Sequence, residues 1–498
     1  MIYLFWQILK YILPSIKRAS IFLLLVHSFI STAQNSNEKA IRVLNNLPHT
    51  FSVSCLVKAK GTIFNLGHYN IPEKTIEIPI EDTYGYFPKE QVNYLNSTIQ
   101  LNGTTFTHGA VTKQDSLCEK GYYENKYKLS GKSETEEFTF QLAKAWPDQL
   151  LAFAWKNKKS LQWICKEGKN DVISFSYKGD DVVTLYINSI SHQVVKVSQP
   201  FYDRIYGNTY RITEYNNYTK EGYPKQRIDW EYGIKERELT YESVQYSVKT
   251  DVIALKKLPE SFTSTLPEPV TPHEKITWES LTPNLDLVKI ESQNNKVLIA
   301  HSEGRLALFE TPAGIPLNQQ ILKEIRQHYP YQNLSHLFVT HHHPDHAGGI
   351  YVYGSLPVTL VTTQGNQLYF TKLLHTNHSW STDSAKIKPS LKMEFVPLNG
   401  AKTFETFGVT AYEIGKENGH TDEHLVYYFP KEKLLWTGDL LFFRTDGRIY
   451  SAGSRGKAIY DLITKHNLIV EKIFTAWPLY NQKLFGTLED LKKSVEVK

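Results

Sequence analysis

A cluster of histidines directly after a short apolar run constrains the fold of this chain more than any other segment. The run Leu337-Phe338-Val339 is followed by Thr340, and then by four histidines and one aspartate between His341 and His346. Imidazole and carboxylate groups are common zinc ligands, and a catalytic zinc ion is held by three protein groups and a water. The pattern therefore predicts a buried strand that ends in a metal-binding loop.

Because zinc ligands are drawn from several loops, further candidates are expected downstream. His420 follows Gly419 in a predicted turn ahead of the apolar strand Leu425–Phe429. Asp439 follows Gly438, just past the predicted strand Leu434–Trp436. Both residues therefore stand where a strand meets a loop, as the first cluster does.

The cluster resembles the H-x-H-x-D-H signature of the metallo-β-lactamase fold superfamily, and His420 and Asp439 follow in the superfamily order. The resemblance covers residues 275–498. It implies an αβ/βα sandwich with the metal loops along one edge. It also implies six metal ligands, namely His341, His343 and His420 in a first site, Asp345 and His346 in a second, and Asp439 as a bridge between them.

One ligand that the family provides is missing from this sequence. The family closes its second site with a histidine after the penultimate strand, and Trp477 stands at that position. An indole nitrogen only donates, so it cannot ligate zinc. We therefore expect one or two zinc ions, with the second site weak or empty unless His375, His378 or His466 substitutes.

The resemblance implies a zinc-dependent hydrolase that acts on a small-molecule ester, lactone, amide or thioester. Zinc lowers the pKa of a bound water toward neutrality, and Asp345 is expected to orient that water and to move a proton. The alternative is a catalytically impaired binding protein whose aromatic N-terminal half captures an apolar or glycan ligand. An iron-dependent redox enzyme would need every ligand, so Trp477 counts against it.

The first 33 residues are typical of a secretory signal. A basic pair, Lys17-Arg18, precedes the apolar run Ile21–Ile30, and the small residues Ser31 to Ala33 fit a cleavage site. The apolar run is short for a membrane span. We therefore expect a periplasmic or secreted protein with no stable membrane span after cleavage; an uncleaved anchor is the alternative.

Residues 34–258 are predicted to form a mainly antiparallel β domain. Segments such as Asp171–Tyr177 and Val182–Ile187 are rich in β-branched and aromatic residues and are separated by turn residues. A few helical stretches are expected to interrupt the strands, for example Glu137–Trp155. The domain is similar to the half-barrels of lipoprotein-sorting proteins.

A proline-rich linker is predicted over residues 259–274, because four prolines there exclude regular structure. In residues 275–498, strands such as Leu334–Thr340 alternate with helices such as Leu317–His328, which predicts sheets covered by helices. The fold class is therefore α+β/α/β. The net charge of +5 on 498 residues, without a dense basic stripe, disfavours nucleic-acid binding.

Overall fold

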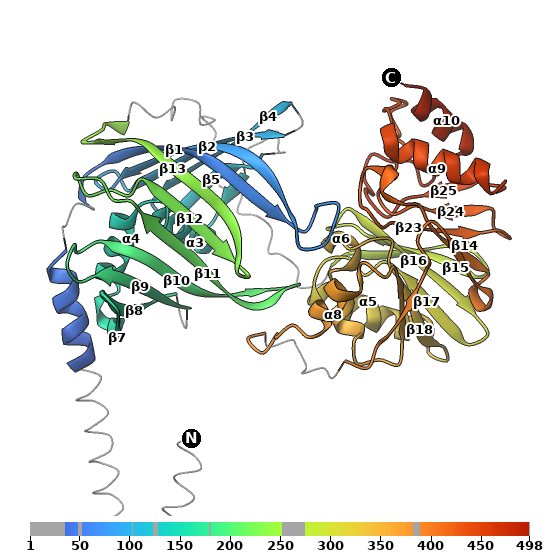
Figure 1. Ribbon diagram of the computed structural model, residues 1–498, viewed down its shortest axis with the longest axis horizontal. Coiled ribbons are helices and arrows are strands. Elements are labelled where there is room, and N and C mark those ends of the chain that lie inside the picture. The colour runs from blue at the N-terminus through green and yellow to red at the C-terminus, as the bar shows by residue number, and fades with distance from the viewer. Residues whose placement is uncertain are drawn as a thin grey trace, which may run out of the picture. The chain divides into compact units, whose positions relative to one another are not determined.

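The computed structural model describes residues 35–47, 52–101, 103–122, 128–178, 181–250, 274–381 and 389–497. The expected signal segment 1–33 lies outside these residues, and so does the expected linker except for its last residue. The chain divides into two compact units, and Figure 1 shows the elements of each. Within the described ranges, no helix is both long and apolar enough to cross a membrane.

Unit 1 is built on one sheet with the strand order β6-β5-β4-β3-β2-β1-β13-β12-β11-β10-β9-β8-β7. Pairing is antiparallel from β2 to β6, from β7 to β10, and from β11 through β13 to β1. The strands are β1 (Cys55–Leu66), β2 (Thr75–Phe87), β3 (Val92–Leu101), β4 (Thr104–Lys113), β5 (Ser116–Lys120), β6 (Lys128–Ser130), β7 (Gln162–Glu167), β8 (Asn170–Lys178), β9 (Asp181–Asn188), β10 (Val194–Asp203), β11 (Gly207–Asn216), β12 (Gln226–Glu231) and β13 (Ile234–Tyr246). The predicted antiparallel β domain is confirmed.

The sheet of unit 1 curves around two helices, α3 (Lys132–Ala143) and α4 (Pro147–Lys156), which are followed by the short helix η2 (Lys158–Ser160) (Figure 1). The helical stretch expected over Glu137–Trp155 is present as two helices. Trp146 has extended backbone angles, and Pro147 opens the second helix, where its missing N–H costs nothing. Apolar side chains of both helices and of a helix over 35–45 pack on the sheet as one core.

Unit 2 contains two sheets and the helices that cover them. The first sheet consists of β14 (Ile276–Thr282), β15 (Leu285–Ile290), β16 (Asn295–Ser302), β17 (Arg305–Phe309), β18 (Asn333–Phe338), β19 (Thr359–Thr362) and β20 (Lys392–Phe395). The second consists of β21 (Ala401–Phe404), β22 (Val409–Glu413), β23 (Leu425–Phe429), β24 (Leu434–Trp436) and β25 (Lys472–Phe474). The helices are α5 (Ile315–His328), α6 (Pro344–Ala347), α7 (Ile350–Tyr353), α8 (Gln367–Leu374), η5 (Glu405–Phe407), η6 (Lys416–Asn418), α9 (Gly453–Lys465) and α10 (Leu488–Glu496).

Three apolar layers hold these elements together as an αβ/βα sandwich. In β16, Val297 and Ile299 pack toward α5, α7 and α8, whereas Leu298 and Ala300 pack between the sheets. In β23, Tyr427 packs between the sheets, while its neighbours in sequence face α9 and α10. Strands buried on both faces are continuously apolar, which is why these strands could be predicted from sequence. The predicted sandwich is confirmed.

Strand direction brings the predicted metal loops to one edge of the sandwich. Strands β17 to β20 run parallel, and so do β24 and β25. The loop that begins at Thr340 follows the carboxyl end of β18, and Asp439 follows the carboxyl end of β24. Carboxyl ends of parallel strands meet at one edge, the usual position of ligand sites in such sheets.

Two segments from the N-terminal half of the chain belong to unit 2. They are residues 64–77, which connect β1 to β2, and residues 201–209, which connect β10 to β11. Lys372 Nζ lies 2.6 Å from Glu73 Oε1, and the backbone N–H of Asn208 donates to the carbonyl of Asn377 at 2.7 Å. The domain boundaries predicted from the sequence placed both segments in the N-terminal domain, residues 34–258. The structure places them in unit 2 with residues 275–498.

Lys296 is a buried cation in the core of unit 2. It is 1% exposed in β16, and its Nζ donates to the carbonyl oxygen of Pro478 at 2.9 Å. Burial, assisted by the charge of Lys289, lowers the pKa of Lys296 to about 7 from 10.5. Between pH 7 and pH 10.5, Lys296 is protonated less often in the folded chain than in the unfolded chain. This residue therefore makes the free energy of unfolding rise with pH across that window.

Lys296→Met removes this titration. Between pH 7 and pH 10, we expect the free energy of unfolding of the wild type to rise by about 3.5 kcal/mol more than that of the variant. Urea unfolding at the two pH values measures both rises, and Lys323→Met, at an exposed lysine of α5, should keep the wild-type rise. Equal rises in the wild type and Lys296→Met would show that the lysine stays charged in the folded protein.

Candidate metal centre

The predicted ligands lie in two adjoining groups that share Asp439. His341, His343, His420 and Asp439 form the first group, and Asp345, His346 and Asp439 form the second; within each group the potential ligand atoms lie within 4.8 Å of one another. His341 Nε2 is 3.1 Å from His420 Nε2, and His346 Nε2 is 3.6 Å from Asp345 Oδ2. Two ligands on one tetrahedral zinc ion are about 3.4 Å apart. The observed separations therefore suit a shared cation in each group.

A relay through Thr340 and Glu310 fixes the tautomer of His341. The Thr340 hydroxyl donates to Glu310 Oε1 at 2.8 Å, so its oxygen accepts from His341 Nδ1 at 2.9 Å. The proton of the imidazole is therefore on Nδ1. Its Nε2 lone pair faces the first group and is free to ligate.

Glu310 also orients His346, in the second group. Its Oε1 lies 3.4 Å from His346 Nδ1, which leaves Nε2 turned toward Asp345 and Asp439. Trp436 Nε1 donates to the same carboxylate at 3.2 Å. Partners of this kind orient metal-binding histidines and raise their basicity, and here one carboxylate serves both groups.

The segment 64–77 supplies the partner that orients His343. His343 Nε2 donates to the carbonyl oxygen of Tyr69 at 3.0 Å, so its Nδ1 carries the lone pair. His342 Nε2 donates to the same carbonyl at 3.1 Å. The neighbouring side chain of His68 places its Nε2 3.6 Å from Asp345 Oδ1. The segment is held by Asn70, whose carbonyl accepts from the Asp422 N–H at 2.8 Å.

The donor set fits a metal ion. Within the described part of the chain, His343 Nδ1, His346 Nε2 and Asp345 Oδ1 are buried and have no hydrogen-bond partner. Buried polar atoms in native proteins are nearly always partnered, and an orphan calls for an explanation such as an ion. Three such atoms around a shared carboxylate are what a zinc site with histidine and aspartate ligands requires.

The ionisation of His341, His343 and Asp439 suits ligation at neutral pH, whereas in the second group the charges of Asp345 and Glu310 outweigh burial and raise the pKa of His346 to about 10. Burial, and then the neighbouring His420, lower the pKa of His343 to about 2. Burial and the surrounding imidazoles also hold the pKa of His341 well below its usual value. Burial opposes ionisation of Asp439, but the adjacent His420 outweighs it and lowers the pKa of that carboxyl. The ligand atoms of both imidazoles are therefore unprotonated and the carboxylate is charged.

The alternatives considered for the missing ligand lie elsewhere. His466 contacts the ring of Tyr412, His378 contacts Tyr202 and Tyr351, and His375 Nδ1 lies 2.8 Å from the carbonyl of Thr371. Trp477 follows β25 and packs its ring edge-on against Phe442 at 5.7 Å. None of the three histidines can therefore complete the second group.

Sequence reasoning missed three residues at this centre. Glu310 looks like an ordinary acid after a strand, and His68 is far away in sequence. His424, which is fully buried, stacks on His341 with ring centroids 4.7 Å apart. The sequence carried a signal for Glu310 alone, which is an acidic residue directly after the predicted apolar strand Leu306–Phe309.

Known proteins of similar sequence are found for part of this chain. Residues 291–497 match the sequence model of the metallo-beta-lactamase superfamily. Hydroxyacylglutathione hydrolase of Francisella philomiragia is 26% identical over 132 residues, which are 26% of this chain and 44% of that protein. The enzyme of that name from Pseudomonas aeruginosa is 29% identical over 123 residues, which are 24% of this chain and 39% of that protein. The chain thus spans less than half the length of these relatives.

Solved structures with similarity to this chain include two from bacteria. A metallo-beta-lactamase from Pontibacter korlensis is 16% identical and has a TM-score of 0.34. The match covers 45% of this chain and 98% of that protein. A metallo beta lactamase from Hirschia baltica is 14% identical and has a TM-score of 0.33. The match covers 45% of this chain and 97% of that protein. The sequence match shows that residues 291–497 of this chain are similar to the metallo-β-lactamase superfamily.

Proposed function

We propose that unit 2 is a zinc-dependent hydrolase of small acyl substrates. The observation that carries this proposal is the pair of adjoining donor groups that share Asp439 and contain orphaned, buried ligand atoms. The first group would hold one ion and the second group another. The signal-like residues 1–33 further predict that the reaction takes place outside the cytoplasm, in the periplasm or after secretion.

A zinc ion in these groups would supply a Lewis acid that activates a carbonyl group and water at neutral pH. The protein's own contribution is to fix the donors. Glu310, through Thr340, keeps the His341 lone pair directed at the first group, and the Tyr69 carbonyl does the same for His343. Pre-oriented ligands avoid a reorganisation cost during the reaction.

Asp345 is the residue best placed to move a proton. Its carboxylate is partly exposed, and one of its oxygens has no hydrogen-bond partner. Although burial opposes ionisation, the nearby His346 and His68 lower the pKa of Asp345 to about 2, so the carboxylate is available as an acceptor. A carboxylate within reach of the attacking water can act as a general base and return the proton to the leaving group.

His68 is the donor that replaces the histidine missing at Trp477. Its Nε2 lies as far from one oxygen of Asp345 as His346 Nε2 lies from the other, 3.6 Å in both cases. The side chain of His68 is 49% exposed and can adjust to an ion. With His68 turned toward the ion, the second group would have four donors, namely His68, Asp345, His346 and Asp439.

The first substrate to test is a hydroxyacyl thioester. Two curated relatives are named hydroxyacylglutathione hydrolase, and an acyl-thioester carbonyl is among the electrophiles that the centre could attack. Esters and lactones follow as the next candidates, because they need the same activation of water and carbonyl.

His343→Ala removes one donor of the first group. In zinc-loaded protein, we expect kcat/KM for a hydroxyacyl thioester to fall at least 100-fold, while far-UV circular dichroism stays unchanged. His375→Ala is the matched control and should keep wild-type activity, because this exposed histidine hydrogen-bonds, among the described residues, to its own helix. Full activity in His343→Ala would contradict a catalytic role for the centre and favour a binding protein.

His68→Ala tests the second group without any substrate. Elemental mass spectrometry of protein purified without chelators should find about two zinc ions per chain in the wild type and in His375→Ala, but about one in His68→Ala. A single ion in the wild type would mean that His68 does not complete the group. Two ions in the variant would show that His68 only lies near the site.

Glu310→Gln should weaken zinc binding by about 10–100-fold, because Glu310 orients a histidine in each group. Competition with a chromophoric chelator measures the affinity directly. Glu303→Gln is the control and should bind zinc like the wild type. Glu303 lies in the exposed turn before β17, the strand that Glu310 follows. Wild-type affinity in Glu310→Gln would exclude a positioning role for this carboxylate.

A further inference from the structure

The connection between β1 and β2 lies against the metal centre. It consists of residues 64–77, here called the strap, and it belongs to unit 2 although the chain on either side of it belongs to unit 1. Gly67 has a φ of +100°, and a Cβ atom on it would lie 2.9 Å from Cγ of Pro344, the residue between His343 and Asp345. The backbone of the strap is therefore in contact with the loop that carries four of the predicted ligands.

The strap contributes to both donor groups of the centre. His68 Nε2 lies 3.6 Å from Asp345 Oδ1, and the carbonyl of Tyr69 accepts from His343 Nε2 at 3.0 Å. The rings of His68 and His343 are also in contact, with centroids 5.2 Å apart. These contacts exist only while the strap lies against the centre. An ion that is held with their help therefore binds the closed strap more tightly than an open one.

Exposed polar contacts attach the strap to the rest of unit 2. Asn70 Nδ2 donates to Asp422 Oδ1 at 2.6 Å, and Lys372 Nζ lies 2.6 Å and 2.8 Å from the two carboxylate oxygens of Glu73. The side chains of Lys372 and Glu73 are 55% and 41% exposed. Exposed ion pairs of this kind add little to stability.

No apolar side chain anchors the strap in a core. All of residues 64–77 are described, none of their apolar side chains is buried, and none belongs to a hydrophobic cluster of either unit. The sandwich strand β23 is buried along its whole length by comparison. Segments with few buried apolar contacts open locally while the rest of the protein stays folded. The strap can therefore open without unfolding of the sandwich.

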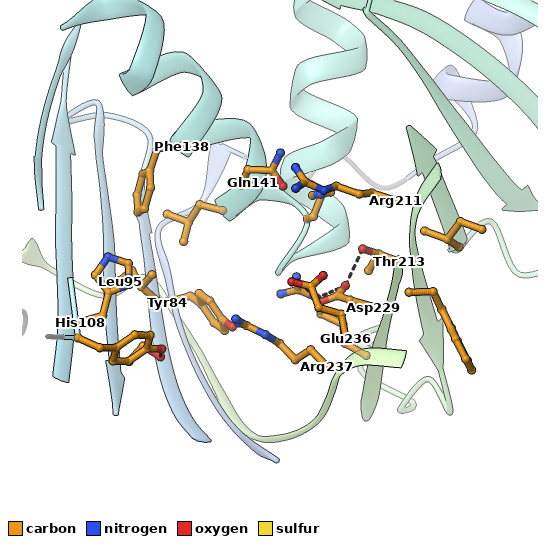
Figure 2. A pocket seen from close by; sticks show the side chains of 17 residues that line it. Tyr84, Leu95, His108, Phe138, Gln141, Arg211, Thr213, Asp229, Glu236 and Arg237 are labelled. Carbon is orange, nitrogen blue, oxygen red and sulfur yellow. Dashed lines mark hydrogen bonds and ion pairs between the residues drawn. The ribbon is translucent and has the colours of Figure 1, made fainter. Parts of the chain in front are cut away.

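The polar contacts inside unit 1 are of the opposite kind. Beside a cavity of about 310 Å³, Thr213 Oγ1 donates to Asp229 at 2.6 Å, and Asp229 also pairs with Arg227 at 2.8 Å (Figure 2). All three side chains are buried. Breaking such a pair leaves an uncompensated buried charge and is strongly destabilising. The ion pairs of the strap have exposed side chains, so its opening carries no such cost.

We propose that residues 64–77 form a latch that opens while the sandwich stays folded and closes when the second donor group takes up an ion. This inference rests on the proposed zinc site of unit 2. An ion that binds the closed state more tightly than the open state shifts the strap toward closure by the ratio of the two affinities. The latch lies outside residues 291–497, which match the family, so the N-terminal half of this chain provides it.

Limited proteolysis of the full chain with trypsin tests the latch, because a protease cuts a segment that has been released from the fold. Trypsin can cut after Lys74, an exposed residue of the strap, and after Lys249, an exposed residue of unit 1 that serves as the internal standard. Relative to cleavage after Lys249, we expect cleavage after Lys74 to be at least fivefold slower with zinc than with a chelator.

Elemental mass spectrometry of the same samples separates the two ways in which this experiment can fail. Equal rates of cleavage after Lys74 in protein that has bound zinc would overturn the latch and leave the proposed zinc site in place. Protein that binds no zinc would overturn both.

Gly67→Ala should keep the latch open, because the added Cβ meets Pro344 and alanine disfavours the positive φ. We expect cleavage after Lys74 to be equally fast with zinc and with a chelator, and bound zinc to fall from about two ions per chain to about one. Gly222→Ala is the matched control, since Gly222 has a φ of +89° in unit 1 with no atom within 4 Å of an added Cβ, and it should behave like the wild type. Protection of Lys74 by zinc in Gly67→Ala would overturn the proposal.

Discussion

The geometry of the metal centre depends on one buried carboxylate, that of Glu310. It is fully buried, and it accepts from the Thr340 hydroxyl and the Trp436 indole while facing His346. These partners come from the loop after β18 and from β24, which belong to different sheets. A carboxylate is costly to bury unless such groups surround it. The two sheets and the two donor groups are therefore held in register by the same interaction.

The sandwich brings the remaining donors within reach of this carboxylate. Its apolar layers fix the strands, and the parallel pairs β17–β18 and β24–β25 direct their following loops to one edge. The backbone of Tyr69 adds a contact that the sandwich itself lacks, since its carbonyl accepts from both His342 and His343. Residues 64–77 are therefore part of the centre as well as part of unit 2.

Much of this could be predicted from the sequence, because local patterns carry it. Leu425–Phe429 is apolar throughout, as a strand buried on both faces must be, and the histidines after β18 follow a recognisable spacing. Contacts between distant segments could not be predicted in this way. His342 and Tyr69 are 273 residues apart in sequence. His68, next to Tyr69, is equally remote, so no local pattern indicates that it could replace the histidine missing at Trp477.

The central claim is that two metal ions lie on either side of Asp439. Anomalous diffraction at the zinc absorption edge, from crystals of the full chain grown with zinc, tests it most directly. We predict two peaks that share the Asp439 carboxylate, one bounded by His341, His343 and His420 and the other by Asp345 and His346. A peak at other residues, or no peak at this edge of the sandwich, would contradict the account.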